Sequence, residues 1–404
     1  MARSGFNACE QRGHFVTKNE SWKIGLLFSK TGVTSIIEQS QINGALLAID
    51  QINAKGGVRG LPLEAVSYDP GSVVSRYGEL AERLIVENKV SVIFGCYMSS
   101  SRKEVLPVVE RRNALFFYPT LYEGFEYSPN VIYGGACPNQ NSVPLAKYLT
   151  SAFGQRIFFV GSNYIYPYES NRVMRNVLRQ AGGEVVGERY FDLTTCAEGF
   201  TDVIKEIMKV RPAAIFSTIV GQSCIEFYRA YHAAGGDGRV CPIASLTTNE
   251  GEIEAIGAEA AVGHITAAPY FRSISSIANR RFLKAYEQQF GSIIDVTSCC
   301  EATYSQVHLF AAALEETGEM DTDTLREALL GKAYDAPQGQ IKIDPDNNHT
   351  YLQSRIATVN EDGEFVIDLK VRRAIKPDPY LVYPAIHDWS FRTQKVTAGG
   401  GDHA

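Results

Sequence analysis

The sequence predicts an α/β protein with two doubly wound lobes. Short apolar runs alternate with stretches whose apolar residues recur at helical spacing, which is the pattern of parallel strands and their crossover helices. The alternation runs up to residue 118 and begins again at residue 141. The chain has 404 residues, which is more than one ordinary hydrophobic core accommodates. These three observations favour two lobes over one.

The first series of elements is clearest around one helix. Its apolar residues fall at positions 42, 45, 46, 49 and 52, and Gly56-Gly57 follows as a helix stop. The next strand ends at the turn Asp69-Pro70-Gly71. We expect strand 23–29, helix 42–54, strand 63–68, helix 76–87, strand 90–95, helix 102–112 and strand 114–118.

The second series repeats this alternation and then changes character. We expect helix 141–152, strand 156–161, helix 169–181, strand 184–190, helix 202–210, strand 213–218, helix 222–234, and strands 242–245 and 264–267. Helices over 278–290, 298–316 and 323–330 follow. A hairpin then pairs 354–360 with 364–371 around the turn Glu361-Asp362-Gly363.

Charge and composition limit the possible partners and the compartment. A formal net charge of −6 argues against direct nucleic-acid binding, which needs clustered Lys and Arg. No apolar stretch reaches the roughly 18 residues that cross a bilayer. Residues 1–21 contain no apolar signal-peptide core, so we expect a disordered leader, a cytoplasmic protein and mostly buried free cysteines. Residues 393–404 are expected to form a flexible tail.

Sequence signatures of enzymes are missing. The chain contains no H-E-x-x-H, no G-x-S-x-G, no phosphate-binding Walker loop and no G-x-G-x-x-G after the first strand. None of the seven histidines lies at metal-ligand spacing to another His or Cys. We therefore expect a binding protein that uses no cofactor and no metal, and that is not an enzyme.

Small polar and aromatic clusters follow three of the expected strands. They are Tyr97-Met98-Ser99, Tyr118-Pro119-Thr120 and Ser162-Asn163-Tyr164-Ile165-Tyr166. Ligands of open α/β sheets bind just beyond the carboxyl ends of strands, so these clusters lie where a ligand is expected. They contain hydroxyls and aromatic rings but no Asp, Arg or Lys, which suits a small neutral polar molecule. For any single tyrosine, a buried ring with a hydrated hydroxyl at a strand end is the alternative.

Several segments carry a more specific resemblance. Gly95-Cys96-Tyr97-Met98-Ser99, Tyr118-Pro119-Thr120 and Pro138-Asn139-Gln140-Asn141, together with 161–167 and 244–248, resemble the amide-sensing branch of the type I periplasmic-binding-protein family. The resemblance spans roughly residues 22–390. Urea and short-chain-amide binding subunits of ABC importers are close relatives of this branch.

The resemblance implies a fold and a pocket. Two lobes joined by three crossovers, near Cys137, Tyr270 and Asn347, are expected to close on the ligand. One lobe would contain 22–137 and 271–347, and the other 138–270 and 348–392. The family's amide pocket corresponds to Tyr97, Ser99, Tyr118, Thr120, Tyr164 and Tyr166. Leu121 stands where the family would have Pro, which leaves the preferred amide open.

The resemblance also implies a function. A ligand-gated sensor of small aliphatic amides or urea would hold a regulatory partner, such as an RNA-binding antiterminator of an amidase or nitrile-degradation operon, and release it when amide binds. We also expect a homo-oligomer. One alternative is the substrate-binding subunit of a urea or short-chain-amide ABC importer, periplasmic or lipid-anchored if an export signal is missing from this chain. An amide-processing enzyme is the other, but it needs a nucleophile beside a base, and none is visible.

Overall fold

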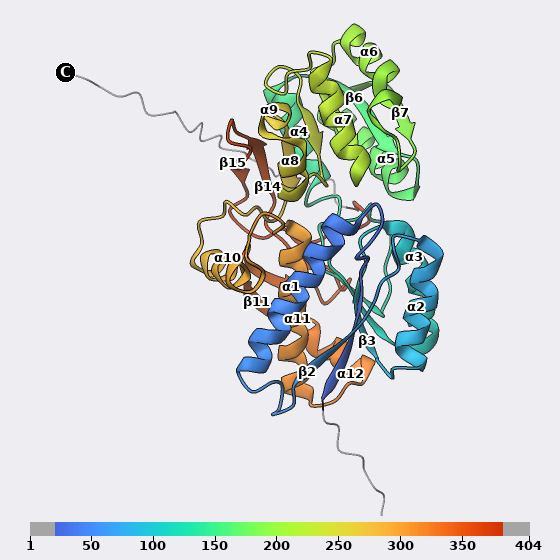
Figure 1. The fold of residues 1–404 in the computed structure, drawn as a ribbon, viewed down its shortest axis with the longest axis vertical. Coiled ribbons are helices and arrows are strands. Elements are labelled where there is room, and N and C mark those ends of the chain that lie inside the picture. The colour runs from blue at the N-terminus through green and yellow to red at the C-terminus, as the bar shows by residue number, and fades with distance from the viewer. Residues whose placement is uncertain (1–20, 383–404) are drawn as a thin grey trace, which may run out of the picture.

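The computed structural model describes residues 21–382, which form two α/β lobes stacked along the long axis of the molecule (Figure 1). The predicted fold class is confirmed. The predicted tail 393–404 lies outside the described residues, and so does the predicted leader 1–21 apart from its last residue.

The first lobe is built on a parallel sheet of five strands in the order β2-β1-β3-β4-β5. The strands are β1 (Trp22–Leu27), β2 (Leu63–Tyr68), β3 (Val92–Gly95), β4 (Leu115–Tyr118) and β5 (Val131–Tyr133). Sequence reasoning missed β5, because three residues are too few to show a strand pattern.

Helices cover both faces of this sheet. Helices α1 (Ser35–Ala54) and α11 (Ser298–Thr317) pack on one face, and α2 (Val74–Val86) and α3 (Ser99–Arg112) on the other. Residues of β3 alternate accordingly, since Val92 and Phe94 join the α1 side and Ile93 joins the α2 side. Two further helices, α10 (Ile277–Phe290) and α12 (Thr322–Leu329), complete the α1 side.

The second lobe is built on a sheet of seven strands in the order β15-β14-β10-β9-β8-β6-β7. The parallel strands are β6 (Arg156–Ser162), β7 (Glu184–Phe191), β8 (Ala214–Thr218), β9 (Ile243–Ser245) and β10 (Ile265–Ala268). The predicted hairpin is confirmed as β14 (Arg355–Val359) and β15 (Phe365–Lys370), which extends the sheet antiparallel to β10.

Helices again cover both faces of the sheet. One face carries α4 (Ser142–Ala152) and α5 (Ile165–Gln180). The other carries the short 3-10 helix Ala197–Phe200, α6 (Thr201–Val210), α7 (Gln222–Ala233), α8 (Glu250–Ile256) and α9 (Ala258–Ala261).

The chain passes between the lobes three times. The passages follow β5, β10 and β13 (Thr350–Tyr351), a strand that forms a small sheet with β11 (Ala333–Ala336) and β12 (Gly339–Ile343). Cys137 and Tyr270 lie in the first two passages, and Asn347 lies just before β13. The division of the chain between the lobes at these three residues stays a prediction.

The lobes also touch where α1 begins. Gly221, between β8 and α7, lies so close to the first lobe that a Cβ there would come within 2.6 Å of the Val33 carbonyl oxygen. Its φ of +66° also favours glycine. Gly251 of α8 faces Ile36 in the same region, since its Cβ would lie 3.6 Å from that side chain. The first turn of α1 therefore contacts the second lobe.

Three features of the described residues bear on the earlier expectations. The cysteines there are free thiols: Cys96, Cys137, Cys196, Cys224, Cys241, Cys299 and Cys300. Among the described helices, none combines the length and the hydrophobicity needed to cross a bilayer. No group of His, Cys, Asp or Glu in 21–382 is arranged to hold a metal ion.

Candidate ligand-binding site

A small pocket lies where polar residues of the two lobes meet. Its free space is about 200 Å³, part of which is continuous with solvent, and it is lined by Tyr97, Ser99, Thr120, Leu121, Tyr164, Tyr166, Val220 and Thr247. Five of the six predicted residues therefore line one pocket. The first lobe contributes them from the ends of β3 and β4, and the second lobe from the end of β6 and the first turn of α5.

Tyr118, the sixth predicted residue, does not line this pocket. It is the last residue of β4, and its side chain is buried among the residues of the α2 side. Its hydroxyl donates to the backbone carbonyl of Tyr97 at 2.9 Å. Tyr118 thus supports the backbone at the end of β3 from beneath the pocket.

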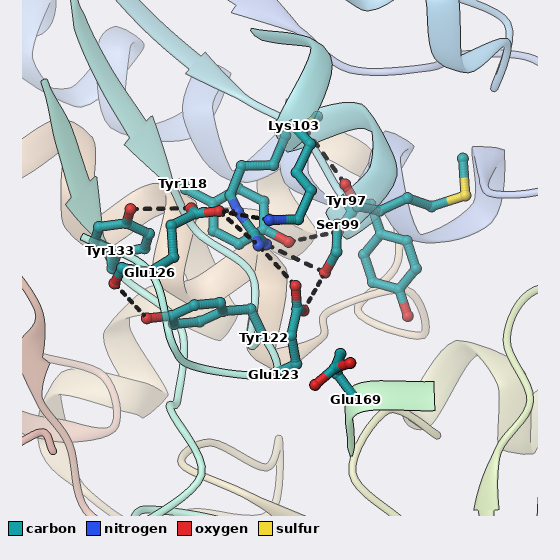
Figure 2. Close-up of polar contacts among 12 residues, drawn as sticks. Tyr97, Ser99, Lys103, Tyr118, Tyr122, Glu123, Glu126, Tyr133 and Glu169 are labelled. Carbon is teal, nitrogen blue, oxygen red and sulfur yellow. Dashed lines mark hydrogen bonds and ion pairs between the residues drawn. The ribbon is translucent and has the colours of Figure 1, made fainter. Parts of the chain in front are cut away.

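Ser99 is the first residue of α3 and belongs to a buried charged network (Figure 2). Its hydroxyl donates to Glu123 Oε2 at 2.6 Å and accepts from Arg102 Nη1 at 3.1 Å. Arg102 also pairs with Glu123 at 2.9 Å and with Glu126 at 2.8 Å, and its side chain is fully buried. Burial by itself lowers the pKa of Arg102, but Glu123, Tyr118 and Glu126 outweigh it and hold that pKa well above the usual value.

The network continues away from the pocket towards the third passage between the lobes. Glu126 accepts from the Tyr133 hydroxyl at 3.0 Å. The hydroxyl of Tyr122 lies 2.6 Å from His349 Nε2, and the ring of Tyr133 stacks on the His349 ring. Burial lowers the pKa of His349 to about 4, so the ring is neutral at pH 7. The pocket is thus connected to a segment that joins the lobes.

Two hydrogen bonds within the first lobe hold Thr120 in place through its hydroxyl. Its hydroxyl donates to the Cys96 carbonyl at 2.9 Å and accepts from Gln41 Nε2 of α1 at 3.1 Å. Its side chain is buried. These bonds fix the orientation of the hydroxyl before any ligand arrives.

Two tyrosine hydroxyls in the lining have no hydrogen-bond partner at ordinary geometry within the described part of the chain. They belong to Tyr97 of the first lobe and Tyr166 of the second, and both are buried. Burial raises the pKa of each phenol, well above its usual value for Tyr97, so both hydroxyls keep their hydrogen. Ser170 lies close enough to the Tyr166 hydroxyl to offset a small part of this rise. A buried polar group without a partner costs about 1–3 kcal/mol, which makes these two hydroxyls candidate contact points for a ligand.

A second cavity of about 390 Å³ adjoins the first and shares Tyr97, Leu121 and Thr247 with it. Its other lining residues are Leu246, Thr248, Asn249, Glu250, Thr266, Ala268, Tyr270, Phe271, Thr297, Ser298 and Cys299. Neither lining contains Lys, Arg or His. A carboxylate ligand would therefore meet no cation at the pocket wall.

Sequence reasoning missed several lining and supporting residues. Thr247 follows β9 much as Ser99 follows β3, so a fourth hydroxyl cluster at a strand end was the available signal. Glu123 and Arg102 carried no such signal, because only the folded chain brings a loop after β4 against the first turn of α3. The same holds for Gln41, a polar residue buried on α1.

The comparisons with known proteins agree with this architecture. A family model described as "Periplasmic binding protein domain" matches residues 22–385. The chain belongs to this periplasmic binding protein family. The match confirms the broader part of the resemblance, which is membership of the type I periplasmic binding proteins. It does not extend to amide binding or to the regulator role.

Curated relatives and solved structures are similar over most of the chain. The Leu/Ile/Val-binding protein homolog 6 of Brucella melitensis is 24% identical and covers 70% of this chain and 78% of its own length. A leucine-, isoleucine-, valine-, threonine- and alanine-binding protein of Pseudomonas aeruginosa is 24% identical over 80% of this chain and 85% of its own.

Solved structures show the same fold at low identity. An ABC transporter solute-binding protein of Rhodopseudomonas palustris, in complex with 3,4-dihydroxybenzoic acid, has a TM-score of 0.80, 22% identity, and coverage of 89% of this chain and 99% of its own. LivJ of Streptococcus pneumoniae with isoleucine has a TM-score of 0.77, 19% identity, and coverage of 88% and 100%. These relatives are all described as binding proteins.

Proposed function

We propose that the protein is the substrate-binding subunit of an ABC importer and that it binds a short-chain amide or urea. The importer role is supported by the relatives, which are solute-binding proteins of transporters. The cytoplasmic location expected from the missing signal-peptide core and the antiterminator partner expected from the resemblance find no support among them. The importer alternative, with a periplasmic protein that docks on permease subunits, fits the family better.

The ligand class is supported mainly by the unpaired hydroxyls of Tyr97 and Tyr166 in a lining without cations. Both hydroxyls can donate to a carbonyl oxygen. A carboxylate ligand would lose its hydration without a counter-charge, which is strongly unfavourable in a buried site. A small uncharged solute fits these conditions.

The expected affinity is modest because the ligand is small. A ligand with four heavy atoms reaches roughly −6 kcal/mol at the ceiling of about −1.5 kcal/mol per atom. This corresponds to a Kd of tens of micromolar. Since hydroxyls from both lobes line the pocket, the ligand would shift the lobes towards the closed form by its differential affinity for that form.

Isothermal titration calorimetry on the purified protein tests the ligand class. Acetamide, propionamide and urea would be compared with leucine, isoleucine and 4-hydroxybenzoate, which represent the ligand chemistry of the relatives. We expect heat from at least one amide or urea at micromolar concentrations and none from the acids. Binding of leucine or the benzoate without binding of the amides would refute the ligand class.

A pull-down from the native host tests the importer role, with and without acetamide. Recovery of permease subunits is the expected result. Recovery of an RNA-binding regulator that leaves the protein when acetamide is added would instead favour the sensor. An assay for ammonia release separates binding from turnover, since a solute-binding protein leaves acetamide intact.

A further inference from the structure

We propose that Glu123 and Arg102 are positioning residues that fix the hydrogen-bond polarity of Ser99, so that the pocket selects a ligand presenting an N–H group there. This inference rests on the proposed function, because it names the feature by which the same pocket would distinguish an amide from the matching carboxylate.

The polarity of Ser99 follows from its two partners. A serine hydroxyl has one hydrogen to donate and two lone pairs that accept. A carboxylate paired with arginine can only accept, so the hydrogen of Ser99 goes to Glu123 at 2.6 Å. A guanidinium can only donate, so Arg102 occupies one lone pair of Ser99 at 3.1 Å. One lone pair remains for a ligand, and it accepts.

Thr120 has the same polarity for an independent reason. The Cys96 carbonyl can only accept, so it takes the single hydrogen of the Thr120 hydroxyl. Gln41 must then donate through Nε2, and its Oε1 has no partner within residues 21–382. Thr120 is therefore also left with one accepting lone pair. The Cys299 thiol interacts with the same hydroxyl, but an S–H group is a weak donor, so a ligand N–H can displace it from that lone pair.

The four hydroxyls together form a donor and acceptor pattern. Ser99 and Thr120 can only accept from a ligand, while Tyr97 and Tyr166 are free to donate. A primary amide offers two N–H donors and a carbonyl acceptor, and urea offers the same groups. A carboxylate offers no hydrogen, so its oxygens would face the lone pairs of Ser99 and Thr120.

Arg102 cannot easily leave this arrangement. Its guanidinium carbon lies 4.8 Å from the ring centroids of both Tyr118 and Tyr122. Glu126 holds it through two further hydrogen bonds, at 2.8 and 3.3 Å. The Arg102 side chain is fully buried, and the network reaches solvent on its far side, where the exposed Lys103 pairs with Glu126 at 3.1 Å. The orientation of Glu123, and through it that of Ser99, is therefore fixed by packing.

Glu123→Gln is the substitution that inverts this polarity at nearly constant shape. The new carbonyl oxygen keeps accepting from Arg102, and the new NH₂ group points to Ser99. Ser99 then accepts from both neighbours, and its hydrogen turns to the pocket. We expect acetamide affinity to fall about 10- to 100-fold while acetate affinity rises, so that the acetamide-over-acetate preference falls at least about 10-fold.

Two comparisons separate positioning from general damage. Glu110→Gln is the matched control, since Glu110 also accepts from a serine, Ser128 Oγ at 2.8 Å, but away from the pocket. It should leave the preference unchanged. In a double-mutant cycle, Glu123→Gln in a Ser99→Ala background should change the preference less than about 2-fold, because the group that it reorients is gone.

The outcomes are distinguishable. Calorimetry on the folded variants, with circular dichroism and thermal melting as checks, gives both affinities. If Glu123→Gln keeps the wild-type preference, or weakens both ligands equally, the positioning role is wrong although the proposed function stands. If the wild-type protein binds neither acetamide nor urea, the proposed function itself fails and this inference fails with it.

Discussion

At the scale of single residues, Thr120 is the most direct test of the pocket. Thr120→Val keeps the shape of the side chain but leaves Gln41 Nε2 and one ligand N–H without an acceptor. A lost buried hydrogen-bond partner costs about 1–3 kcal/mol, so acetamide affinity should fall by about one to two orders of magnitude. Ser99→Ala should behave similarly.

Calorimetry measures this change, and Thr150→Val provides the control. The hydroxyl of Thr150 donates to the backbone carbonyls of Ala146 and Lys147, which belong to the same helix, α4. Unchanged acetamide affinity in both Thr120→Val and Ser99→Ala would place the ligand elsewhere.

Glu252 of α8 is a second residue with a measurable signature. It is fully buried near Tyr97 and Cys299, and its Oε1 has no hydrogen-bond partner in the described chain. Burial raises its pKa from 4.5 to about 8. Its contribution to stability is therefore complete below pH 4.5 and is lost as the pH rises through about 8, because the unfolded chain releases the proton first.

Glu252→Gln should remove this pH dependence while keeping an acceptor for the Asn249 backbone N–H. Between pH 5 and 9, the urea-derived free energy of unfolding should fall by roughly 2–4 kcal/mol more in the wild type than in the variant. The other buried carboxyls with raised pKa, Glu38, Glu250 and Glu301, are common to both proteins. Identical pH profiles would show that Glu252 is already ionised in the folded protein.

The sequence predicted that the site lies at the strand ends, but it did not predict which side chains there enter the pocket. Tyr97 lies beyond β3, where its side chain is free to enter the pocket. Tyr118 is still inside β4, so strand alternation directs it to the same side as Phe116. The expected strands 90–95 and 114–118 already placed Tyr97 outside its strand and Tyr118 inside, but the similar polar clusters led us to assign both residues to the pocket.

At the scale of elements, apolar periodicity located most helices and strands but not where several of them begin. Helix α1 begins at Ser35, and the prediction began at 42, because buried polar residues occupy its first two turns. Glu38 there accepts from the Ser29 backbone and from Tyr77. Helix α5 likewise begins at Ile165, four residues before the predicted start, which puts Tyr166 on a helix. The first turns of α1 are held by tertiary hydrogen bonds, which a periodicity pattern does not contain.

The packing of α1 on α11 gives a prediction at this scale. A Cβ at Gly44 would lie 2.4 Å from the backbone oxygen of Cys300, so Gly44→Ala must push the two helices apart. Overpacking of this kind costs about 1–3 kcal/mol, and urea unfolding should detect it. Gly251→Ala on α8 is the control, because its Cβ would meet nothing closer than 3.4 Å and helix propensity favours alanine. A Gly44→Ala protein as stable as the wild type would contradict the close helix contact.

At the scale of the whole molecule, a contact across the lobes should contribute to ligand affinity. The guanidinium of Arg172 on α5 lies 5.0 Å from the centroid of the Phe125 ring, in the loop after β4. Half-exposed cation–π contacts contribute about 0.5–1 kcal/mol. Because this contact needs the lobes together, Arg172→Met should weaken acetamide binding about 2- to 5-fold.

The matched control is Arg179→Met, an exposed position near the end of the same helix. Arg179→Met should leave the affinity for acetamide unchanged. If the open form prevails without ligand, Arg172→Met should also leave the melting temperature of the ligand-free protein unchanged. Equal affinity in Arg172→Met and wild type would mean that the contact does not stabilise the liganded arrangement.

The contact of the first turn of α1 with Gly221 and Gly251 has a practical consequence. Ile36 in that turn is 46% exposed, so a fluorophore attached there would sit at the rim of the cleft without filling it. The fluorescence emission of this label should change when the second lobe approaches, so the emission would measure solute binding directly. Cys196, the exposed thiol of the described chain, and Cys9, outside it, would first be replaced, leaving Ile36→Cys as the labelling position. The protein thereby offers a scaffold for an optical sensor of the solute that it binds.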